Sequence, residues 1–155
     1  MARRREGRGA VVTDALSVSV AGALDDELAD AVIALLPQLS SSAAFDRDLL
    51  ERVVSSESAE LFVARLDGGI VGMATLVTYP IPTGVRGHID DVVVDESTRG
   101  RGVARALLTS MIARAGEQGI RTLDLTSRPS RVAAIRLYES VGFVRRDTNT
   151  FRYAG

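Results

Sequence analysis

The chain contains no cysteine, no lysine and no tryptophan among its 155 residues, and it has one histidine. Without cysteine it can form no disulfide, no thiolate metal site and no cysteine nucleophile. Without lysine it cannot form a Schiff base with a carbonyl substrate. One histidine and scattered acidic residues do not predict a metal site. The sequence therefore excludes thiol, imine and thiolate-metal chemistry.

Long hydrophobic runs are also missing. No apolar stretch approaches the length that spans a membrane. The basic start, MARRREGRGA, leads into no sustained apolar segment, and Asp14 interrupts the one candidate, so no signal peptide is predicted. We therefore expect a cytoplasmic protein without a membrane partner.

The overall composition is typical of an ordinary globular domain. The formal net charge is −1, 46% of the residues are hydrophobic, and a chain of this length can bury roughly two-thirds of its unfolded surface. We interpret residues 1–13 as a disordered tail and residues 14–155 as a single domain. The arginines of residues 3–8 make nucleic-acid binding an alternative hypothesis, which the slightly negative charge does not favour.

The spacing of apolar residues predicts a mixed sheet with helices on its faces. The helix before Gly142 is expected to begin near Ser127 or Ser130, either of which could cap it. The other predicted elements are strands at 16–21, 87–94 and 121–126, helices at 24–36, 46–55 and 102–118, a hairpin over 60–79 that turns at Asp67-Gly68-Gly69, a loop at 80–87 and a closing hairpin at 143–153.

A glycine- and arginine-rich turn follows the strand at 87–94 and precedes a helix. The start of a helix exposes unpaired backbone N–H groups, where a phosphate can bind. Gly100 and Gly102 allow the main chain to bend and to approach an anion closely, while Arg99, Arg101 and Arg105 bring positive charge. The sequence therefore predicts a site for a phosphate-bearing ligand.

Two motifs carry a family resemblance. Arg99-Gly100-Arg101-Gly102-Val103-Ala104 matches the pattern Gln/Arg-x-x-Gly-x-Gly/Ala, and Leu137-Tyr138-Glu139-Ser140-Val141-Gly142-Phe143 matches the end of a late helix, Leu-Tyr-x-x-x-Gly-Phe. With both motifs at this spacing, residues 16–153 resemble the GNAT-superfamily N-acetyltransferases. The resemblance implies an α/β (α+β) fold whose mixed, mostly antiparallel central sheet has about six or seven strands flanked by about four helices.

The resemblance also implies acetyl-CoA as the acyl-donor cosubstrate. In this family the pantetheine arm pairs with the strand before the turn, so Val92 and Val94 would supply backbone groups and the Val92 N–H would face the thioester carbonyl as an oxyanion donor. The diphosphate would lie on the main-chain N–H groups of the turn. The predicted cofactor-binding residues are Val92, Val93, Val94, Arg99, Gly100, Arg101, Gly102, Val103, Ala104, Arg105 and Ser130.

An amine acceptor must lose a proton before it can attack, because an alkyl amine with a pKa near ~10.4 is almost entirely protonated at neutral pH. His88 lies four residues before Val92, where family members with a glutamate base carry that residue. Asp90 is the rival, either as the base or as the group that holds the substrate ammonium. A chain of water molecules leading to a base remains a further alternative.

Strict alternation along the strand would place His88, Asp90 and Val92 on one side and Asp91 and Val93 on the other. A β-bulge would reverse this alternation on one side of the bulge.

Tyr138 is the predicted general acid. Its position within the late helix puts it on the inward face together with Ala134, Leu137 and Val141, which follow helical spacing. A phenol near the sulfur could protonate the departing CoA thiolate. Two departures from the family pattern are visible: Arg131 stands where many members carry an asparagine that contacts the cofactor, and the strand at 121–126 has no glutamate.

The acceptor is predicted only as a primary amine of a small molecule or peptide. The strand at 87–94 is similar to that of glucosamine-6-phosphate acetyltransferases, and an anionic amine or a peptide N-terminus could suit the nearby arginines. A non-catalytic acyl-CoA-binding sensor is the alternative that shares the same cofactor turn. Many family members pair through their C-terminal strands, so the resemblance also implies a homodimer. The arginines considered for the acceptor are Arg86, Arg145, Arg146 and Arg152.

Overall fold

The computed structural model describes residues 15–155, so the predicted tail at 1–13 lies outside the described residues. No helix within 15–155 is long and apolar enough to cross a membrane. The elements in chain order are β1 (Leu16–Val20), α1 (Asp26–Leu39), α2 (Arg47–Val54), β2 (Ala59–Leu66), β3 (Gly69–Ile81), β4 (Gly84–Val94), the short 3₁₀ helix η1 (Glu96–Thr98), α3 (Val103–Glu117), β5 (Thr122–Asp124) and α4 (Val132–Ser140).

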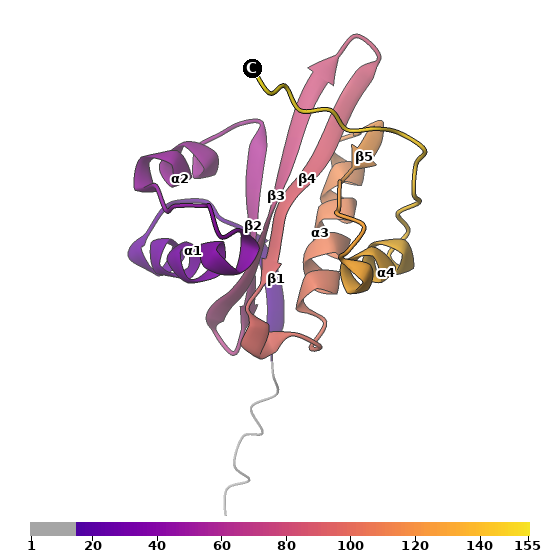
Figure 1. Cartoon of the computed structure of the whole chain (residues 1–155). Helices are drawn as coiled ribbons and strands as arrows, with labels where there is room; N and C mark the ends of the chain where they lie inside the picture. Colours follow the sequence, from indigo (N-terminus) through magenta and orange to yellow (C-terminus); the bar gives the residue numbers. More distant parts are fainter. Residues whose placement is uncertain (1–14) are drawn as a thin grey trace, which may run out of the picture.

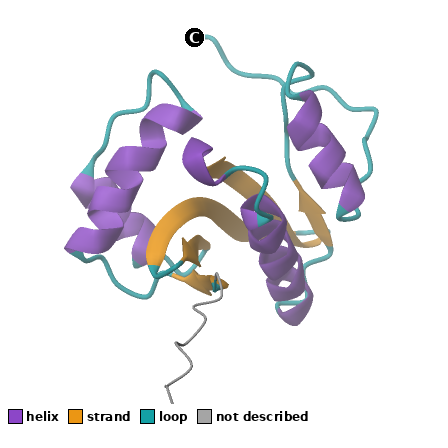
Figure 2. Ribbon diagram, turned by 90° about the horizontal axis from the view of Figure 1, so that it is seen from below, coloured by secondary structure: helices purple, strands orange, loops and turns teal. Residues whose placement is uncertain are grey.

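Within these residues, five strands form one sheet in the order β1-β2-β3-β4-β5. The first four strands pair antiparallel, and β5 joins β4 in parallel. Helices α1 and α2 cover one face of the sheet, and α3 and α4 lie on the other side (Figures 1 and 2). This arrangement confirms the predicted mixed α/β fold, although the described part has fewer strands than the six or seven expected.

Each face of the sheet has its own apolar core. On the α1 side, Leu28, Val32 and Leu35 of the helix pack against strand residues. On the α3 side, Leu107 and Met111 are fully buried among residues of β2, β3 and β4. Burial of a leucine-sized side chain contributes roughly 1.5–3 kcal/mol, so the two cores hold β4 firmly between the two helical layers.

The β2–β3 hairpin turn and the end of α3 form where local sequence signals predicted them. Asp67 and Gly68 have φ angles of 52° and 87°, the left-handed conformation that a two-residue hairpin turn requires. Gly119, with φ of 65°, follows the end of α3. Helix α1 differs at its end: it includes Pro37 and continues to Leu39. Pro37 lacks the N–H that would bond within the helix, yet the helix continues, and the Ser40 amide still donates to the Leu36 carbonyl at 3.0 Å.

The predicted loop at 80–87 is wrong. β3 continues to Ile81 and β4 begins at Gly84, so these residues form the end of a long hairpin, with Pro80 opposite Val85. Proline is tolerated here because β2 pairs with β3 only as far as Val77, leaving Pro80 beyond the last pair on that side. Proline and glycine content alone therefore gave a misleading prediction.

The predicted closing hairpin at 143–153 is also wrong, because these residues form no regular element. Val144, Phe151 and Tyr153 are 84%, 89% and 94% exposed, so they have no apolar face against which a hairpin could pack. In Figure 1 the segment leaves α4 and continues as an extended trace to the C-terminus. The predicted serine caps of α4 are wrong as well, since Arg131 occupies the cap position without a side-chain cap bond.

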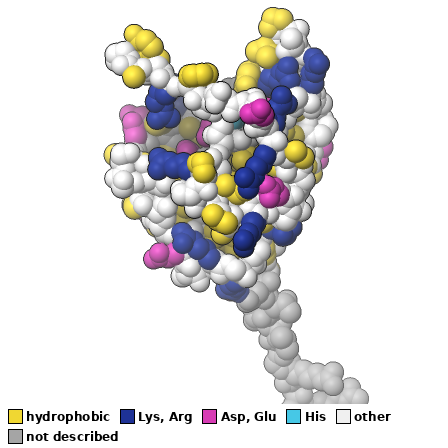
Figure 3. Space-filling model, turned by 45° about the vertical axis from the view of Figure 1, so that its right-hand side comes forward, with side chains coloured by type: hydrophobic (Ala, Val, Ile, Leu, Met, Phe, Trp, Pro, Cys, Tyr) yellow, Lys and Arg dark blue, Asp and Glu magenta, His cyan; other side chains and the backbone are white. Residues whose placement is uncertain are grey.

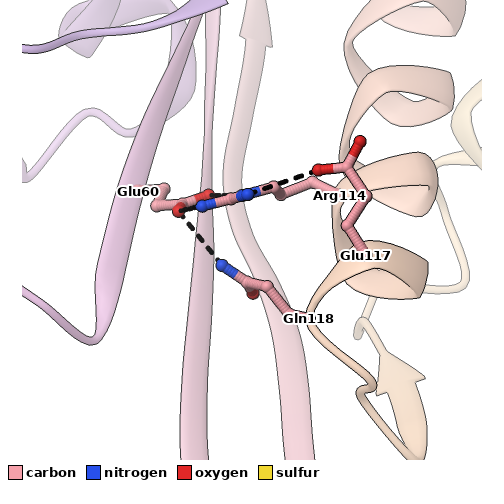
Figure 4. A network of polar contacts seen from close by, with 4 residues as sticks. All are labelled: Glu60, Arg114, Glu117 and Gln118. Atoms are coloured by element: carbon pink, nitrogen blue, oxygen red, sulfur yellow. Dashed lines mark hydrogen bonds and ion pairs between the residues drawn. The ribbon is translucent and has the colours of Figure 1, made fainter.

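A polar network ties the end of α3 to the sheet. Arg114 of α3 donates to Glu60 of β2 through both Nε and Nη2, at 3.0 and 2.7 Å (Figure 4). Glu117 accepts from Arg114 Nη1, and Gln118 Nε2 donates to Glu60 at 3.1 Å. A two-point arginine–carboxylate contact fixes orientation better than a single ion pair. This network holds α3 at the end opposite its glycine-rich start.

Candidate active site

A cleft opens where β4 and β5 separate. The two strands pair only over residues 86–88 and 122–124. Beyond that point, residues Ile89–Val94 of β4 and residues 125–132 line opposite parts of a cleft of about 1470 Å³. Because β5 no longer pairs with β4 there, that edge of β4 can accept an extended ligand as an additional strand.

β4 contains a bulge beside this cleft. Thr75 of β3 pairs with Asp90, whereas Met73 pairs with Val93, so β4 has one more residue than β3 across this interval. Asp91 lies in the bulge with φ of 53°, a left-handed conformation that aspartate tolerates better than most side chains. Bulges commonly re-aim side chains next to functional sites.

The bulge makes the prediction of strict alternation wrong beyond Asp90. Ile89, Val92 and Val94 all pack on the α3 side of the sheet. Val93 packs on the α1 side with Met73, its partner on β3. Asp90 pairs with Thr75, two residues from Met73, so it shares the α1 face with Val93 rather than the face of Val92. Asp90 and Val92 therefore lie on opposite faces.

The two candidate bases are close to each other. His88 Nε2 and Asp90 Oδ2 are 3.6 Å apart, with side chains 28% and 60% exposed. Asp90 lines the cleft, whereas His88 lies beside it and is not among the lining residues. The neighbouring Asp91 also lines the cleft, and its pKa is raised by desolvation and by the like charge of Asp90.

The glycine-rich turn forms a second, connected hollow. Gly100 and Gly102 have φ angles of 78° and 80°, and a Cβ at either would meet nothing within 4 Å. Gly102 is the residue before α3, so the first amides of that helix point out of its end without intrahelical acceptors. A cavity of about 270 Å³ lies against this end. It is lined by Val94, Thr98, Arg99, Gly100, Gly102, Val103, Ala104, Arg105 and Leu137.

The arginines of the turn differ in their positions. Arg99 lines both the cleft and the smaller cavity. Arg105 donates from Nη2 to Ser140 Oγ at 2.9 Å, which turns its side chain toward the end of α4. Arg101 lies in the same turn but is not among the residues lining either hollow. Figure 3 shows arginine side chains on the face that carries α3 and α4.

Tyr138 lies inside the cleft on α4. It is only 8% exposed, belongs to the core beneath α3 and packs edge-on against Phe143 with ring centroids 6.3 Å apart. Burial raises the pKa of the Tyr138 phenol, and the charge of Arg131 partly offsets that rise. A phenol with a raised pKa stays protonated at neutral pH and can donate a proton. Ser130 and Arg131, at the start of α4, line the same cleft.

Sequence reasoning missed part of the cleft wall. Residues Gln38–Ser42, at the end of α1 and the start of the following loop, line it, as do Arg128 and Thr150. The run of three serines at 40–42 was a visible signal, but nothing local connects it to a strand fifty residues later. Conversely, Arg86, Arg145, Arg146 and Arg152 are not among the lining residues.

Comparison with known proteins identifies one family. A model of the Acetyltransferase (GNAT) family matches residues 26–143. Mycothiol acetyltransferase of Thermobispora bispora is 34% identical over 92 residues, which make up 57% of this chain and 31% of that protein. Glucosamine 6-phosphate N-acetyltransferase of Trypanosoma brucei brucei is 37% identical over 87 residues, 54% of this chain and 57% of that protein. Both matches cover less than two-thirds of the relative's length.

A solved structure extends the similarity over most of the chain. The ribosomal-protein-alanine N-acetyltransferase of Brucella melitensis is similar with a TM-score of 0.70 and 25% sequence identity, covering 90% of this chain and 100% of that one. The similarity in fold therefore extends over nine-tenths of this chain.

Proposed function

Because the chain belongs to the acetyltransferase (GNAT) family, we propose that it transfers an acetyl group from acetyl-CoA to a primary amine of a small molecule or peptide. The observation that carries this proposal is the single cleft that joins three features. These are the unpaired edge of β4, the glycine-rich start of α3 and the buried hydroxyl-bearing side chain of Tyr138.

The donor's phosphates match the glycine-rich turn. Acetyl-CoA is the acyl donor of this family, and its diphosphate is a strong hydrogen-bond acceptor. The amides that begin at Gly100 and the guanidinium of Arg99 would receive it, aided by the positive end of the α3 dipole. Ser130, on the opposite wall, would contact the same ligand. The pantetheine arm would then follow the open edge of β4 past Val92 and Val94.

The reaction proceeds by direct attack of the amine on the thioester carbonyl. A C–N bond forms, the Val92 N–H stabilises the oxyanion, and the C–S bond then breaks. Tyr138 donates its phenolic proton to the departing sulfur, and the proton lost by the amine passes to a base. The buried position of Tyr138 beside β4 supports its role, because a proton donor must lie within hydrogen-bond reach of the leaving group.

Asp90 and His88 would bind the acceptor amine and accept its proton. Asp90 lines the cleft and can hold the substrate ammonium by a charge-assisted hydrogen bond. His88 Nε2, 3.6 Å from Asp90 Oδ2, is a nitrogen to which the proton could pass, directly or through water. These positions support different roles for the two residues: Asp90 would contact the substrate amine, and His88 would accept the proton without lining the cleft.

Thiol release from acetyl-CoA in the presence of an amine panel tests the proposal. Saturable release that depends on amine and falls strongly in Tyr138→Phe supports it. Tyr79→Phe is the matched control, since Tyr79 is exposed near the end of the β3–β4 hairpin and does not line the cleft. Tight cofactor binding without release for any amine would instead indicate a non-catalytic acyl-CoA sensor and refute the enzyme proposal.

One relative adds a more specific candidate. The similarity to glucosamine 6-phosphate N-acetyltransferase of Trypanosoma brucei brucei, at 37% identity, supports an amino-sugar acceptor as a second candidate. Comparing glucosamine 6-phosphate with simple amines in the same assay separates this candidate from the general proposal.

A further inference from the structure

The part of the cleft beside Asp90 has an uncharged polar wall. Helix α1 ends there, and the loop after it continues the wall, with one residue contributed by the C-terminal segment. These wall residues are Gln38, Leu39, Ser40, Ser41, Ser42 and Thr150. Five of the six carry a hydroxyl or an amide, and none carries a charge.

The wall and Asp90 lie on the same side of the sheet. The register of β3 and β4 places Asp90 on the face that α1 covers. Gln38 Oε1 accepts a hydrogen bond from the Glu96 amide at 2.9 Å, which fixes the end of α1 beside the segment that follows β4. Because Asp90 and the wall line one cleft and lie on the same face of the sheet, a ligand whose ammonium reaches Asp90 can extend along this wall.

The positive charges of the cleft lie elsewhere. Arg99 comes from the glycine-rich turn, and Arg128 and Arg131 come from the segment between β5 and α4. Two arginines once considered for an anionic acceptor have other partners: Arg86 donates to Thr122 Oγ1 and Thr83 Oγ1, and Arg145 donates to Glu139. Among the described residues that line the cleft, the cations thus come from the segments expected to bind the donor, and the charged side chains on the acceptor side are the carboxylates of β4.

From this distribution we infer that the acceptor is an unphosphorylated amino sugar, a ring that carries one primary amine and several hydroxyl groups. This inference rests on the proposed acetyltransferase function. The amine contacts Asp90, and the sugar hydroxyls exchange hydrogen bonds with the wall, where Ser40 Oγ and Ser42 Oγ already bond to each other at 3.1 Å and the exposed Ser41 hydroxyl lies between them in the chain. A phosphate on the acceptor would face Asp90 and Asp91, and no cation from residues 15–155 lines that wall to neutralise it.

An acceptor panel tests the inference in the full chain at saturating acetyl-CoA. The panel contains glucosamine, glucosamine 6-phosphate, cyclohexylamine, which keeps the ring and amine but has no hydroxyls, and an alanyl peptide. We expect kcat/KM for glucosamine to exceed that of each of the other three by at least about ten-fold. A preference for any of the other three overturns this inference but leaves the acetyltransferase proposal intact. Release with none of them counts against both.

A single-residue variant tests the wall itself. Ser41 is exposed on the loop, and its side chain makes no hydrogen bond to other residues within 15–155, so Ser41→Ala should leave the fold unchanged. Loss of one ligand hydrogen bond should raise the KM for glucosamine about five-fold and leave kcat/KM for cyclohexylamine unchanged. Ser19→Ala, on the exposed outer strand β1, is the matched control. Equal loss with both amines, or no loss with glucosamine, would overturn the inference.

Discussion

Gly102 and Gly116 provide a pair of substitutions with opposite expected effects on stability. Both glycines belong to the same helical region, and a Cβ at either would meet no atom within 4 Å. Their backbones differ: Gly102, before α3, has φ of 80°, whereas Gly116 lies within the last turn of α3. Any difference between Gly102→Ala and Gly116→Ala therefore comes from backbone conformation and not from steric contact.

The magnitudes follow from the conformations. An L-residue in the left-handed region costs about 1–2 kcal/mol, so Gly102→Ala should destabilise the protein by that amount. Alanine within a helix is about 0.5–1 kcal/mol better than glycine, so Gly116→Ala should stabilise it. For a chain of this size, each kcal/mol corresponds to about 2–4 °C in Tm. The two variants should therefore shift Tm in opposite directions.

Urea unfolding followed by circular dichroism measures both changes, with thermal melts as a second readout. The same two variants should differ in cofactor affinity, because a distorted turn at Gly102 re-aims the first amides of α3 while Gly116 lies at the far end of the helix. If Gly102→Ala stabilises the protein as much as Gly116→Ala, the folded protein does not require a left-handed backbone at residue 102. That result would contradict the phosphate site proposed for this turn.

Further substitutions test the site and the core. Tyr138→Phe should lower kcat by about 10²-fold with little change in KM, because the proposed role of Tyr138 is to donate a proton to the leaving sulfur. Steady-state kinetics measures both constants, and a change in KM with kcat unchanged would contradict that role. Leu107→Ala should cost about 2–5 kcal/mol in urea unfolding, since Leu107 is fully buried, and a smaller cost would mean that the core refills the cavity. Burial and Asp90 raise the pKa of Asp91, so its ionised form opposes folding. Asp91→Asn should therefore raise Tm at pH 7, with a gain that disappears below the ordinary aspartate pKa; a gain that persists there would have another cause. Hydrogen bonds from Ser97 lower the pKa of Asp95, so Asp95→Asn should lower Tm at pH 7, and this loss should shrink as pH falls through the lowered pKa.

Local signals in the sequence correctly predicted the position of the glycine-rich turn and the inward orientation of Tyr138. Gly100 and Gly102 were predicted to let the main chain bend between a strand and an apolar helix, and both have a positive φ in the turn that forms there. The helical spacing of Leu137 and Tyr138 predicted that Tyr138 points inward, and it is buried in the core beneath α3. These features depend on residues close in sequence, which is why periodicity and glycine placement were sufficient.

Features that depend on distant residues could not be predicted in the same way. The bulge at Asp91 inserts one residue against β3, and only the pairing of Thr75 and Met73 with β4 reveals it. That one residue places Val92 on the α3 face, opposite Asp90 on the α1 face. Ser40–Ser42 likewise line the same cleft as Asp90 only because α1 packs on the sheet.

Weak local signals failed for a related reason. Residues 80–87 contain prolines and glycines that are typical of a loop, yet cross-strand pairing extends the hairpin through most of them. Residues 143–153 have enough β-forming residues to suggest a hairpin, but no neighbouring apolar surface receives Phe151 or Tyr153. Tertiary contacts decided both segments, as they often do where intrinsic preference is small.

Isothermal titration calorimetry of the full chain with acetyl-CoA tests most directly whether the start of α3 holds the donor's diphosphate. We predict saturable binding to the original chain and a Kd about ten- to a hundred-fold higher for Arg99→Ala, because a charge-assisted hydrogen bond is worth roughly 1.5–3 kcal/mol. Absence of heat with both acetyl-CoA and free CoA, or an unchanged Kd in Arg99→Ala, would contradict that assignment.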